Sequence, residues 1–136
     1  MNTQIYVNLP VKDLDKSMAF FTAVGFKNNP KFTDKTAACM AVTDEINAML
    51  LTHPKFKDAT GEKPIADAHK MNEVLTCLSF ADKAKVNEIV DSAIAAGGVE
   101  VKEAHDDGFM YHRGFSDLDG HIWEVIWMDP NGIKKQ

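Results

Sequence analysis

The segment GFSDLDGHIWEVIWMDP, residues 114–130, carries a carboxylate, Glu124, within a run that otherwise has the pattern of a buried strand. Strand interiors seldom contain a charge without a partner or a task, because a buried carboxylate loses its hydration. Glu124 is therefore a candidate metal ligand, catalytic base or polar anchor for a ligand. The competing interpretation is a carboxylate with no remaining role.

The turn before Glu124 predicts which residues are its neighbours. Leu118, Asp119 and Gly120 have the pattern of a three-residue hairpin loop in which glycine takes the positive φ. This register places Gly114 opposite Glu124, so that no side chain fills the space above the carboxylate. A four-residue turn, the less favoured alternative, would place Arg113 there instead.

Strand alternation then divides the hairpin into two faces. His112 falls on the face of Glu124, and the two side chains are candidates for an acid–base or substrate-anchoring pair. The alternative for His112 is a half-exposed histidine that hydrogen-bonds water. The opposite face is large and apolar, which indicates that Trp123 and Trp127 pack beneath a helix rather than stack on a ligand. His121 is expected to be structural.

The elements that must position this hairpin occur twice along the chain. In each half a strand is followed by a helix with an aspartate N-cap, Asp13 or Asp82, and a glycine stop, Gly25 or Gly97. Three more strands follow each helix. The expected strands are 4–9, 27–32, 37–42 and 46–52 in the first half, and 74–80, 99–102, 109–116 and 121–128 in the second.

The chain therefore predicts a single α+β domain of 136 residues made of two tandem βαβββ modules, about 3–53 and 74–129. The connector between them, about 54–73, lacks clear periodicity. It is either a linker with a short helix or a lid near a site.

The tandem βαβββ order and the pattern Asp-x-Asp-Gly-x-x-x-Glu resemble the vicinal oxygen chelate superfamily. This superfamily includes glyoxalase I, bleomycin-resistance and fosfomycin-resistance proteins, and extradiol dioxygenases. The resemblance is carried by LPVKDLDKSMAFFTAVGF, residues 9–26, and FSDLDGHIWEV, residues 115–125. It implies two curved half-barrels that form a cup-shaped mixed sheet, a divalent ion held by four side chains in metal-dependent members, and a homodimer.

The four ligand positions that the resemblance implies are mostly filled by residues that do not bind such ions. They fall on Tyr6, near Leu50, near Leu75 and on Glu124, and Glu124 alone is a usual ligand. An alignment slip of one residue restores neither histidine nor carboxylate, since it offers Met49, Leu51, Val74 or Thr76. We therefore expect no metal at the usual site and no cofactor. A divalent metal is the less favoured alternative, and a non-standard site using His53, His69 or His112 stays open.

Alternation along the strands also predicts the walls of the implied cup. The expected ligand-binding residues beside Glu124 and His112 are Tyr6, Asn8, Leu50, Thr52, Leu75, Cys77 and Gly114. These residues give a mixed apolar surface with a few polar groups, which is typical of a small-molecule pocket.

Composition limits the partners and the compartment. The formal net charge of −5 disfavours nucleic acids and anionic membranes, since neither offers counter-charge to an acidic surface. No apolar run is long enough to cross a bilayer, and the expected location is the cytoplasm. Cys39 and Cys77 have no metal-type spacing and are expected to be buried, reduced thiols.

The favoured function is a glyoxalase/bleomycin-resistance-like protein that binds a small molecule in the cup without the usual metal. The alternative is a lyase or isomerase of the same superfamily, lactoylglutathione-lyase-like, that uses Glu124 as the base with or without a divalent metal. A third interpretation is an assembly subunit whose cavity has no ligand.

Overall fold

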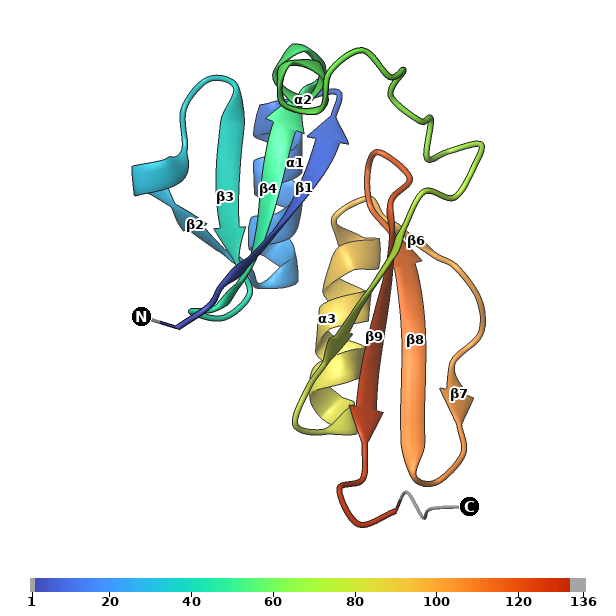
Figure 1. The fold of residues 1–136 in the computed structure, drawn as a ribbon. Coiled ribbons are helices and arrows are strands. Elements are labelled where there is room, and N and C mark those ends of the chain that lie inside the picture. Colours follow the sequence, from blue (N-terminus) through green and yellow to red (C-terminus); the bar gives the residue numbers. More distant parts are fainter. Residues whose placement is uncertain (1, 133–136) are drawn as a thin grey trace. The chain divides into compact units, whose positions relative to one another are not determined.

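A computed structural model describes residues 2–132, and the chain divides into two compact units, Met1–Asp67 and Ala68–Gln136. Each unit contains one mixed sheet with a helix packed against it (Figure 1). The α+β class with tandem βαβββ modules is confirmed, because both halves contain the predicted elements in order, with one additional short strand in the second half.

The first unit contains a four-stranded sheet with the order β1-β4-β3-β2, in which β1 and β4 are parallel and the other pairs antiparallel. Its elements are β1 (Ile5–Val11), α1 (Leu14–Val24), β2 (Lys27–Asn29), a 3₁₀ turn η1 (Pro30–Phe32), β3 (Ala37–Ala41), β4 (Ile46–Thr52) and α2 (His53–Thr60). The strand predicted over 27–32 ends early, because Pro30 lacks the N–H that a continuing ladder requires.

Helix α1 begins and ends where the sequence predicts. The Asp13 side chain accepts a hydrogen bond from the backbone N–H of Lys16 at 3.0 Å, and Gly25 closes the helix with φ 116°. Its apolar face buries Phe20, Phe21 and other side chains in the core of this unit. Helix α2 lies in the connector, which agrees with the linker that contains a short helix.

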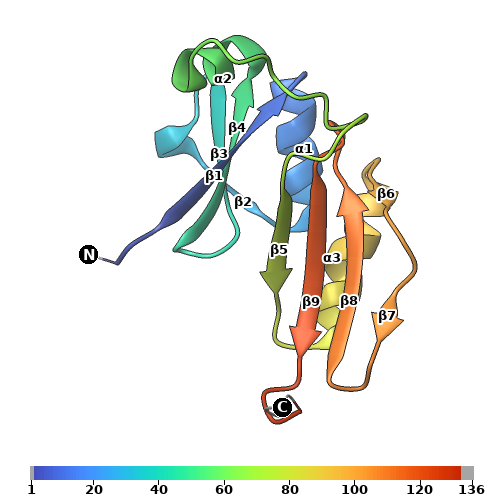
Figure 2. The ribbon, with the colours of Figure 1, turned by 45° about the vertical axis from the view of Figure 1, so that its right-hand side comes forward.

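The second unit contains a five-stranded sheet with the order β5-β9-β8-β6, and β7 also pairs with β8. Its elements are β5 (Leu75–Ser79), α3 (Lys83–Ala95), β6 (Val99–Glu100), β7 (His105–Asp106), β8 (Met110–Ser116) and β9 (Ile122–Met128). Figure 2 shows β5, β9 and β8 side by side with α3 behind them, so this helix covers one face of the sheet. The short strand β7 was not predicted.

The helix-covered face holds the core of the second unit. Phe115 and Trp123 are 1% and 2% exposed and stack with ring centroids 6.3 Å apart. The prediction that Trp123 belongs to the core is therefore confirmed. Trp127 lies on the helix side as predicted, with the ammonium group of Lys83 5.3 Å from its ring centroid, but it is half-buried rather than part of the core. Lys83 is the first residue of α3, so Trp127 lies near the end of the helix that covers this face.

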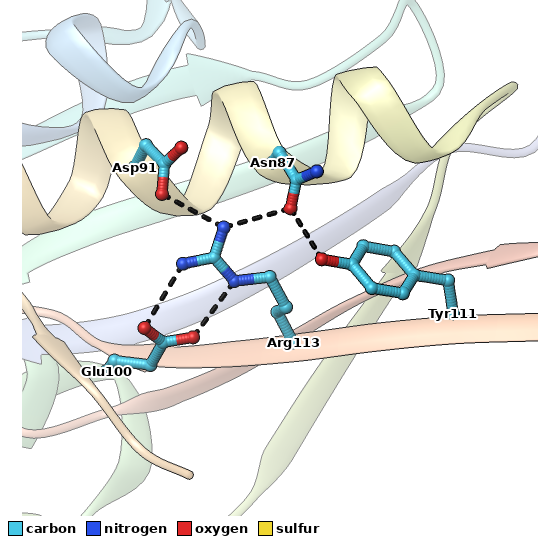
Figure 3. Close-up of polar contacts among 5 residues, drawn as sticks. All are labelled: Asn87, Asp91, Glu100, Tyr111 and Arg113. Atoms are coloured by element: carbon cyan, nitrogen blue, oxygen red, sulfur yellow. Dashed lines mark hydrogen bonds and ion pairs between the residues drawn. The ribbon is translucent and has the colours of Figure 1, made fainter. Parts of the chain in front are cut away.

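An arginine lies on this same face, where the sequence indicated apolar packing. Arg113 is 9% exposed and makes two hydrogen bonds to Glu100, at 2.9 and 3.1 Å (Figure 3). Its Nη1 donates to Asp91 at 2.9 Å and to Asn87 at 3.0 Å on α3. The hydrogen bonds to Glu100 are the largest cause of a raised pKa of Arg113. The network therefore joins α3, β6 and β8 through one guanidinium group.

Within residues 2–132 no helix is long and apolar enough to cross a membrane.

Candidate functional site

The open face of the second unit's sheet contains Glu124 in the predicted register. Gly114 lies opposite Glu124 and His112 opposite Ile126, as the three-residue loop requires. The loop itself is confirmed by Gly120, which has φ 87°, and by the hydrogen bond of 3.0 Å from the Asp117 N–H to the His121 carbonyl. The alternative register, with Arg113 opposite Glu124, is excluded.

Strand β5 adds a thiol beside the carboxylate. Cys77 pairs with Glu124 across the parallel β5–β9 ladder, and paired residues project to the same side of the sheet. Partial loss of solvation raises the pKa of the Cys77 thiol to about 11, although the residue as a whole is exposed, and the charge of Glu124 and a side-chain hydrogen bond to it act in the same direction. The thiol is therefore protonated at neutral pH and donates to Glu124.

Cys77 differs from its sequence interpretation in burial. Cys39 is buried as predicted, whereas Cys77 is exposed, and both are free thiols. The reason is its position on the face that α3 does not cover.

His112 approaches the Glu124 carboxylate from β8, which flanks β9 on the side opposite to β5. Its Nδ1 is 3.7 Å from Oε2 of Glu124, and this nitrogen is buried without a hydrogen-bond partner. The ring centroids of His105 and His112 are 4.9 Å apart, and Nε2 of His105 is 2.6 Å from Oδ1 of Asp107. The pairing of His112 with Glu124 is thus a close approach that is longer than a hydrogen bond.

A cavity of about 430 Å³ opens next to Glu124 and is called the Glu124 cavity below. Apolar side chains and several polar groups form its walls, and this mixture suits a small molecule. The lining residues are Asn72, Glu73, Val74, Leu75, Val101, Lys102, Arg113, Gly114, Ile122, Trp123 and Glu124. Of the predicted site residues, the cavity brings together Glu124, Gly114 and Leu75.

The space above Gly114 is only partly open. A Cβ at this position would lie 3.8 Å from Cβ of Val101 and 3.3 Å from the carbonyl oxygen of Trp123. Val101 is held there by a hydrogen bond of 3.0 Å from its N–H to the Gly114 carbonyl. An added Cβ would thus make ordinary contact with Val101, and only its approach to the Trp123 carbonyl on β9 would be tight.

The sequence did not identify Glu73, Asn72, Lys102 and Val101 as lining residues. They belong to irregular segments that precede β5 or follow β6, where strand alternation gives no orientation. The sequence offered one indication that Glu73 lies near a site, namely its position directly before an apolar strand.

The turn of the β8–β9 hairpin forms a buried polar cluster behind the cavity. One oxygen of Asp117 accepts from the N–H groups of Asp119 and His121, each at 3.0 Å, and the other accepts from the Trp123 indole at 3.1 Å. Burial raises the pKa of Asp117, and nearby His121 opposes that shift. His121 is 3% exposed, as expected for a histidine that packs within the fold.

In the first unit, Tyr6 and Asn8 share the exposed side of β1. The Tyr6 hydroxyl donates to Gln4 at 2.6 Å and the Asn8 amide donates to the Tyr6 carbonyl at 3.0 Å. The prediction that Leu50 and Thr52 share this side is wrong, because they pair with Leu9 and Val11 on the opposite side. Leu50 is 0% exposed. Apolar residues on both sides of β4 left no alternation from which to fix the register.

The registers also locate the four metal-ligand positions that the fold type implies. In the second module, Glu124 pairs with Cys77, which lies two residues after the first-strand position, Leu75. In the first module, the residue two positions after Tyr6 is Asn8, and Asn8 pairs with Met49. The fourth-strand position of the first module is thus Met49 rather than Leu50. A donor set with one carboxylate does not fit a divalent ion. Among residues 2–132, His, Cys, Asp and Glu side chains form no group of three or more that could hold a metal, and His53 and His69 are exposed.

Comparisons with known proteins agree with this fold. A family model for the bleomycin resistance protein-like N-terminal region matches residues 3–43. Hypothetical protein SA1046 from S. aureus has a similar structure, with 27% identity, a TM-score of 0.75, and coverage of 93% of this chain and 94% of that one. A search of curated proteins gave no significant match.

Two further structures share the fold at lower identity. A glyoxalase/bleomycin resistance protein/dioxygenase family enzyme from Burkholderia phytofirmans PsJN is 18% identical, with a TM-score of 0.75 and coverage of 93% of this chain and 99% of that one. A glyoxalase-related enzyme from Fulvimarina pelagi is 16% identical, with a TM-score of 0.76 and coverage of 93% and 88% respectively. The tandem βαβββ modules, the family match in the first module and these structures together support the resemblance to the vicinal oxygen chelate superfamily.

Proposed function

We propose that this protein binds a small molecule in the Glu124 cavity, with Glu124 as the polar anchor. The observation that carries the proposal is the cavity of about 430 Å³ on the open face of the second sheet. Leu75, Val101 and Ile122 offer apolar contact there, and the Glu124 side chain is 29% exposed. A partly buried carboxylate among apolar walls can orient a ligand that carries a hydrogen-bond donor.

The binding needs neither a metal nor another cofactor in this proposal. The positions that would hold the ion supply one carboxylate, and Leu75 offers a hydrocarbon side chain at the cavity instead. A ligand would therefore be held by hydrogen bonds and apolar contact.

The Cys77 thiol supports the role of Glu124 as an anchor. Because Cys77 stays protonated at neutral pH, its S–H can donate to the carboxylate and fix its orientation. In this arrangement the side of the Glu124 carboxylate that faces the cavity stays available to a ligand.

The alternative is a lyase or isomerase of the superfamily in which Glu124 removes a proton next to a carbonyl. The close approach of His112 Nδ1 to Glu124, at 3.7 Å, favours it, since a second titratable group could pass the proton on. Exchange of a carbon-bound ligand proton with solvent deuterium, lost in Glu124→Gln, would support the enzyme. Binding without exchange supports the binding protein.

We further propose that the protein is a cytoplasmic homodimer that does not bind nucleic acids or anionic membranes. Its net charge of −5 supports the exclusion of these anionic partners.

The proposed function is tested by screening a small-molecule library against isotope-labelled protein by NMR. We expect hits to shift the amide signals of Leu75, Val101, Gly114 and Glu124 and to bind more weakly to Glu124→Gln. Glu103→Gln removes an exposed carboxylate that does not line the cavity and serves as the control. Hits that leave these signals unchanged, or that bind both variants equally, would reject the proposal.

A further inference from the structure

The Glu124 cavity has a second carboxylate, which comes from the connector rather than from the sheet. Glu73 lies two residues before β5, lines the cavity, and has a side chain that is 25% exposed. A carboxylate in such a wall can accept a hydrogen bond from a bound molecule.

The buried side chain of His121 contacts the carboxylate of Glu73. Nδ1 of His121 is 3.3 Å from Oε1 of Glu73, and the His121 side chain is 4% exposed. An ionised carboxylate only accepts, so Nδ1 carries the hydrogen and donates it. One oxygen of Glu73 is thereby held on the protein side of the wall.

The histidine is itself fixed by the hairpin turn. Its N–H donates to Asp117 at 3.0 Å, and its carbonyl accepts from the Asp117 N–H at 3.0 Å. Gly120 next to it lies so close to the connector that an added Cβ would be 2.7 Å from N of His69 and 2.8 Å from C of Ala68. The turn therefore supports the connector segment 68–74 and the carboxylate that it carries.

We infer that Glu73 is a specificity-determining residue of the Glu124 cavity, which accepts a hydrogen bond from an amine-bearing ligand and is held in the wall by His121. The inference rests on the proposed function, namely that the cavity takes a small molecule. It adds the chemical class of the ligand and a positioning residue outside the cavity.

The charges around the cavity support a protonated amine over an anion. Glu73 and Glu124 both line it, whereas the guanidinium of Arg113 is bound by Glu100 and Asp91 on the helix face. Lys102 is a further lining cation, but it is exposed and belongs to the segment after β6. A ligand with an ammonium group and an apolar body matches the two carboxylates and the hydrocarbon walls.

The test uses three probes that share one indole ring: tryptamine, N-acetyltryptamine and indole-3-propionate. NMR titration measures their affinities for the unmodified protein and for Glu73→Gln. We expect tryptamine to bind at about millimolar concentration and to lose about tenfold or more in Glu73→Gln, as expected for a hydrogen bond to a charged group. The neutral probe should bind both proteins equally. Glu62→Gln, which removes an exposed carboxylate from the same connector, should change nothing.

Two variants of the histidine separate positioning from general damage. His121→Leu removes the donor to Glu73 and should lower tryptamine affinity while N-acetyltryptamine affinity stays the same. His121→Asn keeps a donor near the position of Nδ1 and should restore most of the preference. If His121→Leu does not fold, His121→Asn and Glu73→Gln still decide the outcome.

Equal binding of tryptamine and indole-3-propionate, or unchanged tryptamine binding in Glu73→Gln, would overturn the inference. So would the absence of tryptamine binding to the unmodified protein. Other ligands that shift the Glu124 cavity in the library screen would then leave the proposed function standing, so the two failures are distinguishable.

Discussion

At the scale of single residues, the contact between Cys77 and Glu124 gives the most direct chemical prediction. The carboxylate contributes two of the causes that raise the pKa of Cys77 to about 11, although burial is the largest. In Glu124→Gln we expect this pKa to fall toward the ordinary value of about 8.5. The rate of iodoacetamide alkylation against pH, measured in a Cys39→Ala background, reports the change.

The sign of the linked stability effect follows from the same shift. Because folding raises the pKa of the Cys77 thiol, its contribution to stability is complete below the unfolded-state value and is lost as the pH rises toward about 11. Stability of the unmodified protein should therefore decrease above about pH 8.5, and this decrease should be smaller in Glu124→Gln. An alkylation profile that is identical in both proteins would contradict the contact.

Arg113 carries a second prediction at this scale. Arg113→Met keeps the aliphatic stem but removes the hydrogen bonds to Glu100, Asp91 and Asn87, and should lower the free energy of unfolding by about 1–3 kcal/mol. Asp91 is 67% exposed, so Asp91→Asn should cost less than about 1 kcal/mol. Urea denaturation measures both, and equal losses would show that the guanidinium network does not stabilise the unit.

At the scale of elements, the β8–β9 hairpin connects the core to the Glu124 cavity. Gly120 and Gly108 have nearly the same φ, 87° and 88°, but only Gly120 has backbone atoms within 4 Å of an added Cβ. Gly108→Ala should cost about 1–2 kcal/mol from strain alone. Gly120→Ala should cost about 2–4 kcal/mol, because the connector must also move.

Hydrogen exchange distinguishes the two glycine variants further. We expect faster exchange in residues 68–74 of Gly120→Ala and no change there in Gly108→Ala. If both variants lose the same stability and leave this segment protected, the hairpin turn does not support the connector.

The sequence predicted the hairpin well because its signals are local. Gly120 and the aspartates around it specify the loop, and the loop fixes Gly114 opposite Glu124. The helix caps Asp13 and Asp82 are similarly local, and each accepts from the backbone N–H three residues later.

Features that depend on tertiary pairing were less predictable. The side of β4 on which Leu50 lies follows from its pairing with Leu9, which no residue near Leu50 encodes. Glu73 and Val101 reach the cavity from irregular segments, and their places follow from contacts with His121 and Gly114 that are distant in sequence. Arg113 is buried because three partners converge on it from α3 and β6.

At the scale of the whole molecule, the sheets lead to an expectation about assembly. Taken separately, each sheet has edge strands on both sides, among them β1 in the first unit and β5 in the second. Unpaired strand edges favour pairing with other strands, and closed two-fold assemblies are the commonest solution. We expect a homodimer in light scattering at micromolar concentration, and a mass equal to one chain would reject it.

The central claim is that the protein binds a small molecule at Glu124 without the usual metal of the vicinal oxygen chelate superfamily. Native mass spectrometry of protein purified without chelators tests it most directly, since one spectrum resolves bound metal and bound organic ligand. The predicted result is a noncovalent small molecule on the unmodified protein, reduced in Glu124→Gln, with no stoichiometric metal in either. Stoichiometric zinc, nickel, iron or manganese that disappears in Glu124→Gln would contradict the account.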